Sequence, residues 1–340
     1  MSDTTALPVD AVGRWLSARD TSIVPPLRAE LLTGGRSNLT YLVCDAAGAR
    51  WVLRRPPMSG VIASAHDVLR EYRIMSALAG TAVPVPRMVA ACEDPAVVGV
   101  PFFVMDYVPG VVPGDQQVAE QTLDLPARAA LGPHLVDVLA GLHSITPSDV
   151  GLAGLGKGSD YVTRQLTRWE GQLDRLGATV TAAMRDVLTR LRDGAPVQRE
   201  TTIVHGDFRP ANMIVGEAGE VRAVLDWELA TLGDPLADLG WLVAYWGAPG
   251  DGVPLPRPTR SAGYVSRERL AERYAEASGR PLDDLGYYLA FALWRLAAIL
   301  AGVNARARQG AYGAASVDVA DAWVEQLTHA ARAATQAAGR

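Results

Sequence analysis

Apolar residues in the first third of the chain fall into short runs of β-strand length that turn residues separate. Five such runs cover residues 28–33, 39–44, 50–55, 87–92 and 101–108. Gly34-Gly35 ends the first run, and the residues from Asp45 to Gly48 end the second, as turn residues do between paired strands. The pattern therefore predicts a small antiparallel sheet of five strands before residue 110.

Helical spacing takes over in the remainder of the chain. Leu131, Leu135 and Leu142 belong to one apolar stripe that a core-facing helix would bury. The same period is found in residues 9–18, 64–79, 160–175 and 178–193. Beyond residue 202, a short β-rich patch interrupts the helices. We predict an α+β fold with two lobes, a sheet-based N-lobe at 1–110 and a large helical C-lobe at 111–340.

Composition narrows the range of functions. The chain has 340 residues, of which 49% are hydrophobic and 20% charged, so a large core can form and wholesale disorder is excluded. The net charge of −5 comes without a basic stripe, which argues against a nucleic-acid partner. Two cysteines and an N-terminus without signal-peptide character predict a cytoplasmic protein. The sequence does not indicate an oligomeric state.

The most apolar stretch, residues 287–303, is interrupted by Arg295 and is shorter than the ~20 residues that a bilayer span needs. We therefore predict a buried helix there and no membrane partner.

The strongest chemical signal is a polar loop between two apolar runs. It reads His205-Gly206-Asp207-Phe208-Arg209-Pro210-Ala211-Asn212, and Asp226 follows after a predicted hairpin. An aspartate beside a strand end can accept a hydroxyl proton, and the oxygens of Asn212 and Asp226 are ligands that Mg²⁺ prefers. Phosphoryl transfer needs such positioning and charge, with little covalent help.

This loop resembles that of the aminoglycoside phosphotransferase family, whose fold is protein-kinase-like. The resemblance implies an ATP-dependent kinase in which Asp207 is the catalytic base. It further implies that Asn212 and Asp226 bind Mg²⁺, and that Arg209 contacts the transferred phosphate. By the same resemblance Asp238 braces the loop, which His205 orients.

The N-terminal part agrees with this resemblance. Gly35, Ser37 and Asn38 lie between two predicted strands, where such kinases cover the nucleotide phosphates with backbone N–H groups. Arg54 stands where the family keeps a strand lysine, and Glu71 lies on the next predicted helix. Strand alternation favours Arg54 over its neighbour Arg55 for the phosphates.

The substitution of arginine for lysine has a consequence for activity. Lys157 is the single lysine of the chain, and an arginine fork does not replace an ammonium group one for one. A nucleotide-binding pseudokinase that acts as a regulatory module is therefore an alternative. In a third interpretation, a metallophosphoesterase, His205 and Asp207 would join a metal cluster with Asp226. The other histidines offer no context for such a cluster.

The run from Phe102 to Gly110 resembles the hinge of these kinases. If this strand lies at the sheet edge, the Asp106 carbonyl and the Val108 N–H are available to adenine, and Met105 guards the pocket. A buried strand that ends at a Pro-Gly turn explains the same residues.

The expected partner is a small molecule that carries a hydroxyl acceptor. From residue 250 onward eleven arginines face nine acids, which favours a neutral or anionic acceptor over a polycationic aminoglycoside, the alternative substrate. The segments 34–41, 52–57 and 65–71 resemble the kinase domains joined to acyl-CoA dehydrogenases. That resemblance implies a hydroxyacyl acceptor, such as a CoA thioester.

Overall fold

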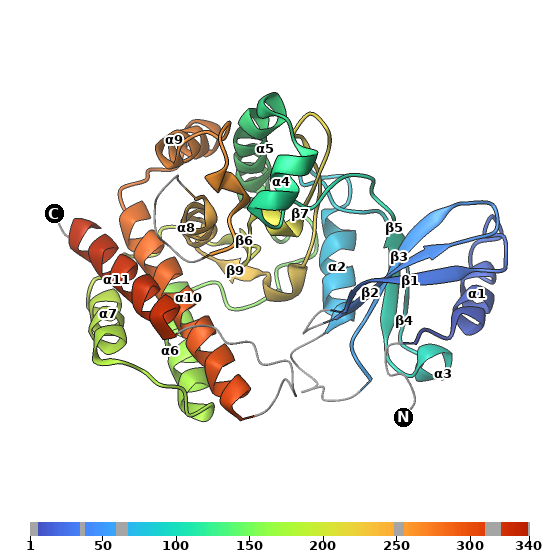
Figure 1. Ribbon diagram of the computed structural model, residues 1–340, viewed down its shortest axis with the longest axis horizontal. Helices are drawn as coiled ribbons and strands as arrows, with labels where there is room; N and C mark the ends of the chain where they lie inside the picture. The colour runs from blue at the N-terminus through green and yellow to red at the C-terminus, as the bar shows by residue number, and fades with distance from the viewer. Residues whose placement is uncertain (1–5, 35–37, 59–66, 248–254, 310–320, 339–340) are drawn as a thin grey trace. The chain divides into compact units, whose positions relative to one another are not determined.

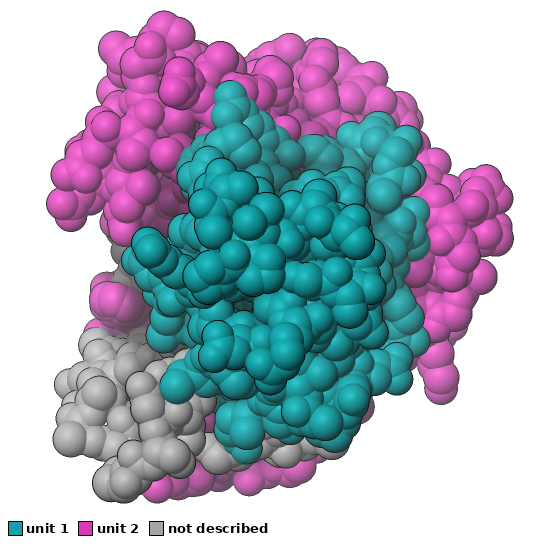
Figure 2. Space-filling view, turned by 90° about the vertical axis from the view of Figure 1, so that its right-hand side faces the viewer, with its two compact units in different colours: residues 1–110, 222–228 teal, residues 111–221, 229–340 magenta. Residues whose placement is uncertain are grey.

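The computed structural model describes residues 6–34, 38–58, 67–247, 255–309 and 321–338 (Figure 1). The chain divides into two compact units (Figure 2). The first unit comprises residues 1–110 and 222–228, and the second comprises residues 111–221 and 229–340. Asp226 therefore belongs to the first unit, whereas Asp207 and Asn212 belong to the second.

A five-stranded antiparallel sheet with the order β1-β2-β3-β5-β4 forms the centre of the first unit. Its strands are β1 (Arg28–Gly34), β2 (Leu39–Cys44), β3 (Arg50–Arg55), β4 (Met88–Cys92) and β5 (Phe102–Asp106). All five strands lie where the apolar runs of the sequence predict them. The fold class predicted from the sequence is confirmed.

Helices cover both faces of this sheet (Figure 1). Helix α1 (Val9–Ser17) packs with α3 (Pro95–Val98) on the face that carries Leu53 and Phe102. Helix α2 (Val68–Leu78) packs against β4 and β5 on the opposite face, where Tyr72 contacts the ring of Phe103. Because strand side chains alternate between faces, Arg54 lies on the same face of β3 as Val52 and meets α2.

The prediction that the strand before the hinge is an edge strand is wrong. Strand β5 lies between β3 and β4, and Asp106 N donates a hydrogen bond to Arg87 O at 2.9 Å. The run at 87–92 folds back alongside β5, so that the outer edge on this side belongs to β4. The end of β5 can still bind a ligand, but only through backbone N–H and C=O groups that are not hydrogen-bonded to β3 or β4.

The second unit is mainly helical. Its helices are α4 (Gln116–Thr122), α5 (Leu125–Ser144), α6 (Tyr161–Arg175), α7 (Ala182–Asp193), α8 (Pro235–Tyr245), α9 (Arg267–Ser278), α10 (Leu285–Arg308) and α11 (Asp321–Ala338). Short strands and turns of 3₁₀-helix connect them: β6 (Thr202–Val204), η1 (Pro210–Asn212), β7 (Met213–Val215), β9 (Thr231–Gly233) and η3 (Pro258–Arg260). Strands β6 and β9 pair antiparallel. β8 (Val221–Val224) and η2 (Trp227–Leu229) cover most of residues 222–228, the segment that belongs to the first unit.

Helix α10 is the centre of the second unit. It packs against α6, α7, α8 and α11, and its residues from Tyr287 to Ala305 are mostly buried. Among the described residues it is the one helix long and apolar enough to cross a bilayer, and 78% of its apolar window is buried inside the protein. The predicted buried helix is therefore confirmed, and Arg295 lies within it.

Candidate active site

The polar loop begins where β6 ends, and the carboxylate of Asp238 holds its first two residues. Asp238 Oδ2 accepts a hydrogen bond from His205 N at 2.6 Å, and Asp238 Oδ1 accepts one from Gly206 N at 2.8 Å. Asp238 lies in the first turn of α8, where the helix dipole favours a negative charge. The predicted bracing of the loop by Asp238 is confirmed.

Gly206 makes the bend that follows. Its φ of +82° lies in the left-handed region, and a Cβ atom there would come within 2.9 Å of the Leu229 carbonyl oxygen. Asp207 N donates to His205 Nδ1 at 3.1 Å, so a neutral His205 ring carries its proton on Nε2. His205 is fully buried, and its ring is placed to hold the loop in this bend.

A buried network supports Asp238 from behind. Burial alone would raise the pKa of this carboxyl group. The hydrogen bond from His143, the charges of His143 and His205 and the hydrogen bond from Gly206 N outweigh burial and lower the pKa. His143 Nε2 lies 3.4 Å from Asp238 Oδ2, and its Nδ1 lies 2.7 Å from the Tyr274 hydroxyl. The network therefore keeps Asp238 ionised and able to accept both backbone N–H groups.

Three donors hold the carboxylate of Asp207. Trp241 Nε1 donates to Oδ1 at 2.7 Å, and Asn212 Nδ2 donates to Oδ2 at 2.7 Å. Arg209 Nε donates to both oxygens, at 3.0 and 3.2 Å. The structure thus brings Asp207, Arg209 and Asn212 together, as the spacing of the motif predicts.

The side chain of Asn212 is oriented by two bonds from its nitrogen. Nδ2 donates to the backbone oxygen of Asp207 at 2.8 Å as well as to the Asp207 carboxylate. The amide oxygen is consequently the atom of Asn212 that a metal ion would meet. The guanidinium of Arg209 lies over the ring of Tyr245, 4.8 Å from its centroid.

A second charged cluster lies within the first unit. Arg54 Nε is 3.1 Å from Glu71 Oε2, and Arg54 Nη2 donates to Asp226 Oδ1 at 2.6 Å. The predicted pairing of Arg54 with Glu71 is present. Arg55 points the other way, where its Nη2 donates to the Tyr41 hydroxyl at 2.9 Å. The choice of Arg54 over Arg55 from strand alternation therefore agrees with the structure.

Burial sets the charge balance of this cluster. Burial raises the pKa of Glu71 to about 7, against the opposing effect of Arg54. For Arg54 burial would lower the pKa, but the negative charges of Glu71 and Asp226 outweigh it and raise the pKa. The cluster holds a permanent cation that two carboxyl groups share.

Asp226 combines a strained backbone with the chemistry of a magnesium ligand. Its φ of +65° is uncommon for a residue other than glycine, and such strain is often stored at functional sites. The oxygens of Asp226 and Asn212 suit Mg²⁺, which takes few protein ligands and keeps several waters. Because the two residues belong to different units, their sharing of one ion stays a prediction. In the described part of the chain, no group of three or more His, Cys, Asp or Glu side chains is arranged to hold a metal ion.

The remaining predicted nucleotide residues have mixed outcomes. Gly35 and Ser37 lie outside the described residues. Asn38 begins the next segment and is buried, and its Oδ1 has no hydrogen-bond partner in the described structure. Met105 is buried in β5, and the carboxylate of Asp106 is held by Arg87 at 2.7 and 2.9 Å. The backbone of Asp106 and Val108 remains the predicted adenine contact.

The sequence motif missed four residues around the loop. Each of these residues contacts Asp207 or Asp238 directly or through one other residue. They are Trp241, Tyr245, Arg295 and His143. Two signals could have found three of the four, Trp241, Tyr245 and Arg295. Asp238, Trp241 and Tyr245 recur at helical spacing, and Arg295 is the one charge in a long apolar run.

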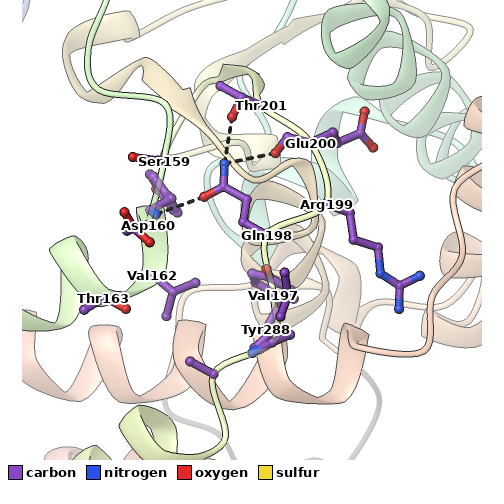
Figure 3. Close-up of a pocket in the computed structure, with 13 residues that line it drawn as sticks. Ser159, Asp160, Val162, Thr163, Val197, Gln198, Arg199, Glu200, Thr201 and Tyr288 are labelled. Carbon is purple, nitrogen blue, oxygen red and sulfur yellow. Dashed lines mark hydrogen bonds between the residues drawn. The ribbon is translucent and has the colours of Figure 1, made fainter.

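A separate pocket of about 460 Å³ lies between the start of α6 and the segment 195–201 (Figure 3). Gln198 is its central polar group. Its Oε1 accepts a hydrogen bond from Tyr161 N at 3.0 Å, and its Nε2 donates to Gly158 O at 2.7 Å and to Thr201 Oγ1 at 2.8 Å. The amide therefore serves to hold the chain together. None of the residues 205–212 lines this pocket.

We predict that Asp238→Ala costs about 3–5 kcal/mol of unfolding free energy, because it leaves two buried N–H groups without an acceptor. Urea unfolding of the purified variant measures this. Asp186→Ala, which removes a partly exposed carboxylate from α7 in the same unit, should stay within about 0.5 kcal/mol of the wild type. Equal losses for the two variants would contradict a bracing role of Asp238.

We predict a pH dependence from Glu71. Between its ordinary pKa of 4.5 and the folded value of about 7, the folded protein holds a proton that the unfolded chain releases. Stability from this group is therefore present below pH 4.5 and is lost as the pH rises through 7, by at most about 3 kcal/mol. Glu71→Gln should remove this slope in urea titrations, whereas Glu93→Gln, at an exposed site of the same unit, should keep it. Parallel profiles for wild type and Glu71→Gln would refute the assignment.

Comparison with known proteins identifies the family of the chain. Residues 28–289 match the model of the "Phosphotransferase enzyme family". Acyl-CoA dehydrogenase family member 10 of Mus musculus is 35% identical over 336 residues, covering 96% of this chain and 31% of that protein. Acyl-CoA dehydrogenase family member 11 of Gallus gallus is 33% identical, covering 81% of this chain and 36% of that protein. The chain thus spans about a third of the length of these relatives.

Solved structures agree on the fold. The crystal structure of a candidate aminoglycoside phosphotransferase from Ralstonia eutropha JMP134 has a TM-score of 0.79 and 30% identity, covering 96% of this chain and 99% of that chain. The ternary complex of aminoglycoside phosphotransferase APH(4)-Ia with AMP-PNP and hygromycin B has a TM-score of 0.60 at 17% identity, covering 97% and 99%, and supports the fold alone. With the family model matching most of the chain, this protein belongs to the phosphotransferase enzyme family of the aminoglycoside phosphotransferase kind.

Proposed function

We propose that this protein uses ATP and Mg²⁺ to phosphorylate a hydroxyl group of a small molecule. The observation that carries the proposal is the carboxylate of Asp207, which lies on a braced loop within hydrogen-bond distance of Arg209 and Asn212. Phosphoryl transfer requires a positioned base, a cation for the phosphate oxygens and an oxygen ligand for the metal. These three groups meet here in one loop.

The proposed step balances as follows. The acceptor hydroxyl oxygen forms a bond to the γ-phosphorus while the bond from this phosphorus to the β–γ bridging oxygen breaks, and ADP leaves. Asp207 accepts the hydroxyl proton. Arg209 turns from Asp207 to the oxygens of the transferred group, where a guanidinium binds phosphate in two places.

The cluster around Arg54 provides the second part of the proposal. Asp226, together with the oxygen of Asn212, would hold Mg²⁺, which supplies charge neutralisation between the phosphates. Arg54 would then exchange Asp226 for a nucleotide phosphate while Glu71 keeps hold of its Nε. Two separate nitrogens of one guanidinium make this exchange possible without a loss of both ion pairs.

For the acceptor we propose a hydroxyacyl compound, such as a 3- or 4-hydroxyacyl-CoA. Support comes from the relatives named acyl-CoA dehydrogenase family members 10 and 11, and from the excess of arginines beyond residue 250. An aminoglycoside is the alternative substrate, because similar structures carry that name.

We predict that ATP with Mg²⁺ and 3- or 4-hydroxyacyl-CoA yields a product with one added phosphoryl group, detected by mass spectrometry. Asp207→Asn should lower kcat by about 100-fold or more, as expected for loss of a general base. Asp186→Asn, far from the loop in sequence and partly exposed, should keep the wild-type rate. Phosphorylation of kanamycin in place of hydroxyacyl-CoA would overturn the choice of acceptor and leave the phosphotransferase in place.

A nucleotide-binding regulatory module is a second candidate, since Arg54 already neutralises the predicted metal ligand Asp226 at 2.6 Å. Arg54→Met separates the two functions. If the protein is an enzyme, Arg54→Met should lower kcat/KM for MgATP by about 10- to 100-fold, and Arg54→Lys should retain more activity than Arg54→Met.

The control for this test is Arg73→Met, which removes an exposed arginine from α2 in the same unit. It should match the wild type. A module would instead show no turnover in the wild type, and Arg54→Met would bind Mn²⁺ more tightly in calorimetric titrations because Asp226 is released.

A further inference from the structure

The three donors on Asp207 differ in how freely they can move. Arg209 and Asn212 belong to the same loop as Asp207, and the proposed function assigns them to the phosphate and the metal. Trp241 belongs to helix α8 and is 3% exposed. Metal binding by the Asn212 oxygen leaves its Nδ2 on Oδ2 of Asp207. Once Arg209 turns to the phosphate, Trp241 Nε1 is the donor that remains on Oδ1.

The indole of Trp241 is fixed on both sides. Its ring packs against Tyr245 at a centroid distance of 5.3 Å, and Arg295 lies over it with Cζ 4.1 Å from the ring centroid. Arg295 is 5% exposed and also lies over Trp169, 5.6 Å from that ring's centroid. A rotation of Trp241 away from Asp207 would have to disturb all of these contacts.

Arg295 is an unusual buried cation. Its Nη2 donates to the carbonyl oxygen of Gly206 at 2.9 Å, and within the described structure it forms no ion pair with a carboxylate. Buried charges without an ionic partner are costly, so their retention calls for a role. Here the guanidinium faces the π-system of the same indole whose N–H meets Asp207. A cation over the ring withdraws electron density and strengthens the N–H as a donor.

We propose that Trp241 and Arg295 are positioning residues for the phosphoryl transfer. Trp241 Nε1 keeps Oδ1 of Asp207 engaged throughout the reaction, so that the lone pair of Oδ2 that Arg209 releases is the one that accepts the proton of the acceptor hydroxyl. Arg295 holds the Trp241 ring and the Gly206 carbonyl in place at the same time. The inference rests on the proposed function, since it assigns Arg209 to the transferred phosphate and Asp207 to the proton.

The hydrogen bond itself can be tested without any turnover. In ¹⁵N-tryptophan-labelled protein, the eight indole N–H signals are resolved by NMR, and Trp241→Phe identifies the signal of Trp241. Asp207→Ala should shift this signal and speed its hydrogen exchange at least tenfold, and leave that of Trp246 unchanged. Addition of AMP-PNP and Mg²⁺ to the wild type should leave the Trp241 signal protected. An unmoved signal in Asp207→Ala, or loss of protection with the nucleotide, overturns the proposal.

The catalytic consequence is measured as MgATP hydrolysis to ADP with water as the acceptor. Trp241→Phe keeps the ring and its packing but removes the N–H, so kcat should fall by about 10- to 100-fold with KM for MgATP unchanged. Trp246→Phe is the matched control, because Trp246 caps the same helix and its Nε1 donates to Val265 O at 2.8 Å. It should lower the melting temperature comparably and keep kcat.

Arg295 is tested by a pair of variants. Arg295→Lys retains the cation and a donor for Gly206, and should keep a larger part of kcat than Arg295→Met. Equal kcat for wild type and Trp241→Phe, or equal kcat losses in Trp241→Phe and Trp246→Phe, refutes the positioning role. Absence of both hydrolysis and transfer in the wild type refutes the proposed function instead, and the NMR result then decides the hydrogen bond alone.

Discussion

The carboxylate of Asp238 is the constraint on which the geometry of the loop depends. It accepts hydrogen bonds from two successive backbone N–H groups, at the point where the chain leaves β6 and turns. A buried N–H without an acceptor is costly, so the loop keeps this bend only while Asp238 is ionised and in place. The direction in which Asp207 points follows from the bend, because only one residue separates it from His205.

The sequence predicted those parts of the molecule that short stretches of chain determine. The five strands follow from short apolar runs bounded by turn residues, and the grouping of Asp207, Arg209 and Asn212 follows from offsets within one loop. The position of β5 in the sheet was mispredicted because strand order is decided by pairing with a distant segment, β4, and alternation carries no information about which neighbour a strand takes. Likewise Trp241 and Arg295 lie 34 and 88 residues beyond Asp207 and reach it only through the packing of α8 on α10.

Arginine in place of the family's strand lysine changes how the charged cluster is built. A lysine presents one ammonium group, which must be shared by every carboxylate around it. Arg54 forms an ion pair with Glu71 through Nε and another with Asp226 through Nη2, so the two ion pairs use different atoms of the guanidinium. The substitution therefore preserves the link between β3 and α2 independently of what happens at Asp226. This independence favours an active enzyme, because a metal ion or a phosphate can displace one ion pair while the other holds the strand to the helix.

The layer formed by Arg209, Tyr245, Trp241 and Arg295 shows how a buried cation can be kept without a carboxylate partner. Each arginine lies over an aromatic ring, and the two rings pack against each other below Asp207. Replacing Arg295 by a carboxylate-paired cation would place a second negative charge near Asp207 and compete for its donors. An aromatic face stabilises the guanidinium by its quadrupole and adds no net charge. The guanidinium of Arg295 is consequently held by the Gly206 carbonyl and by the ring of Trp241, the residue whose N–H donates to the carboxylate of Asp207.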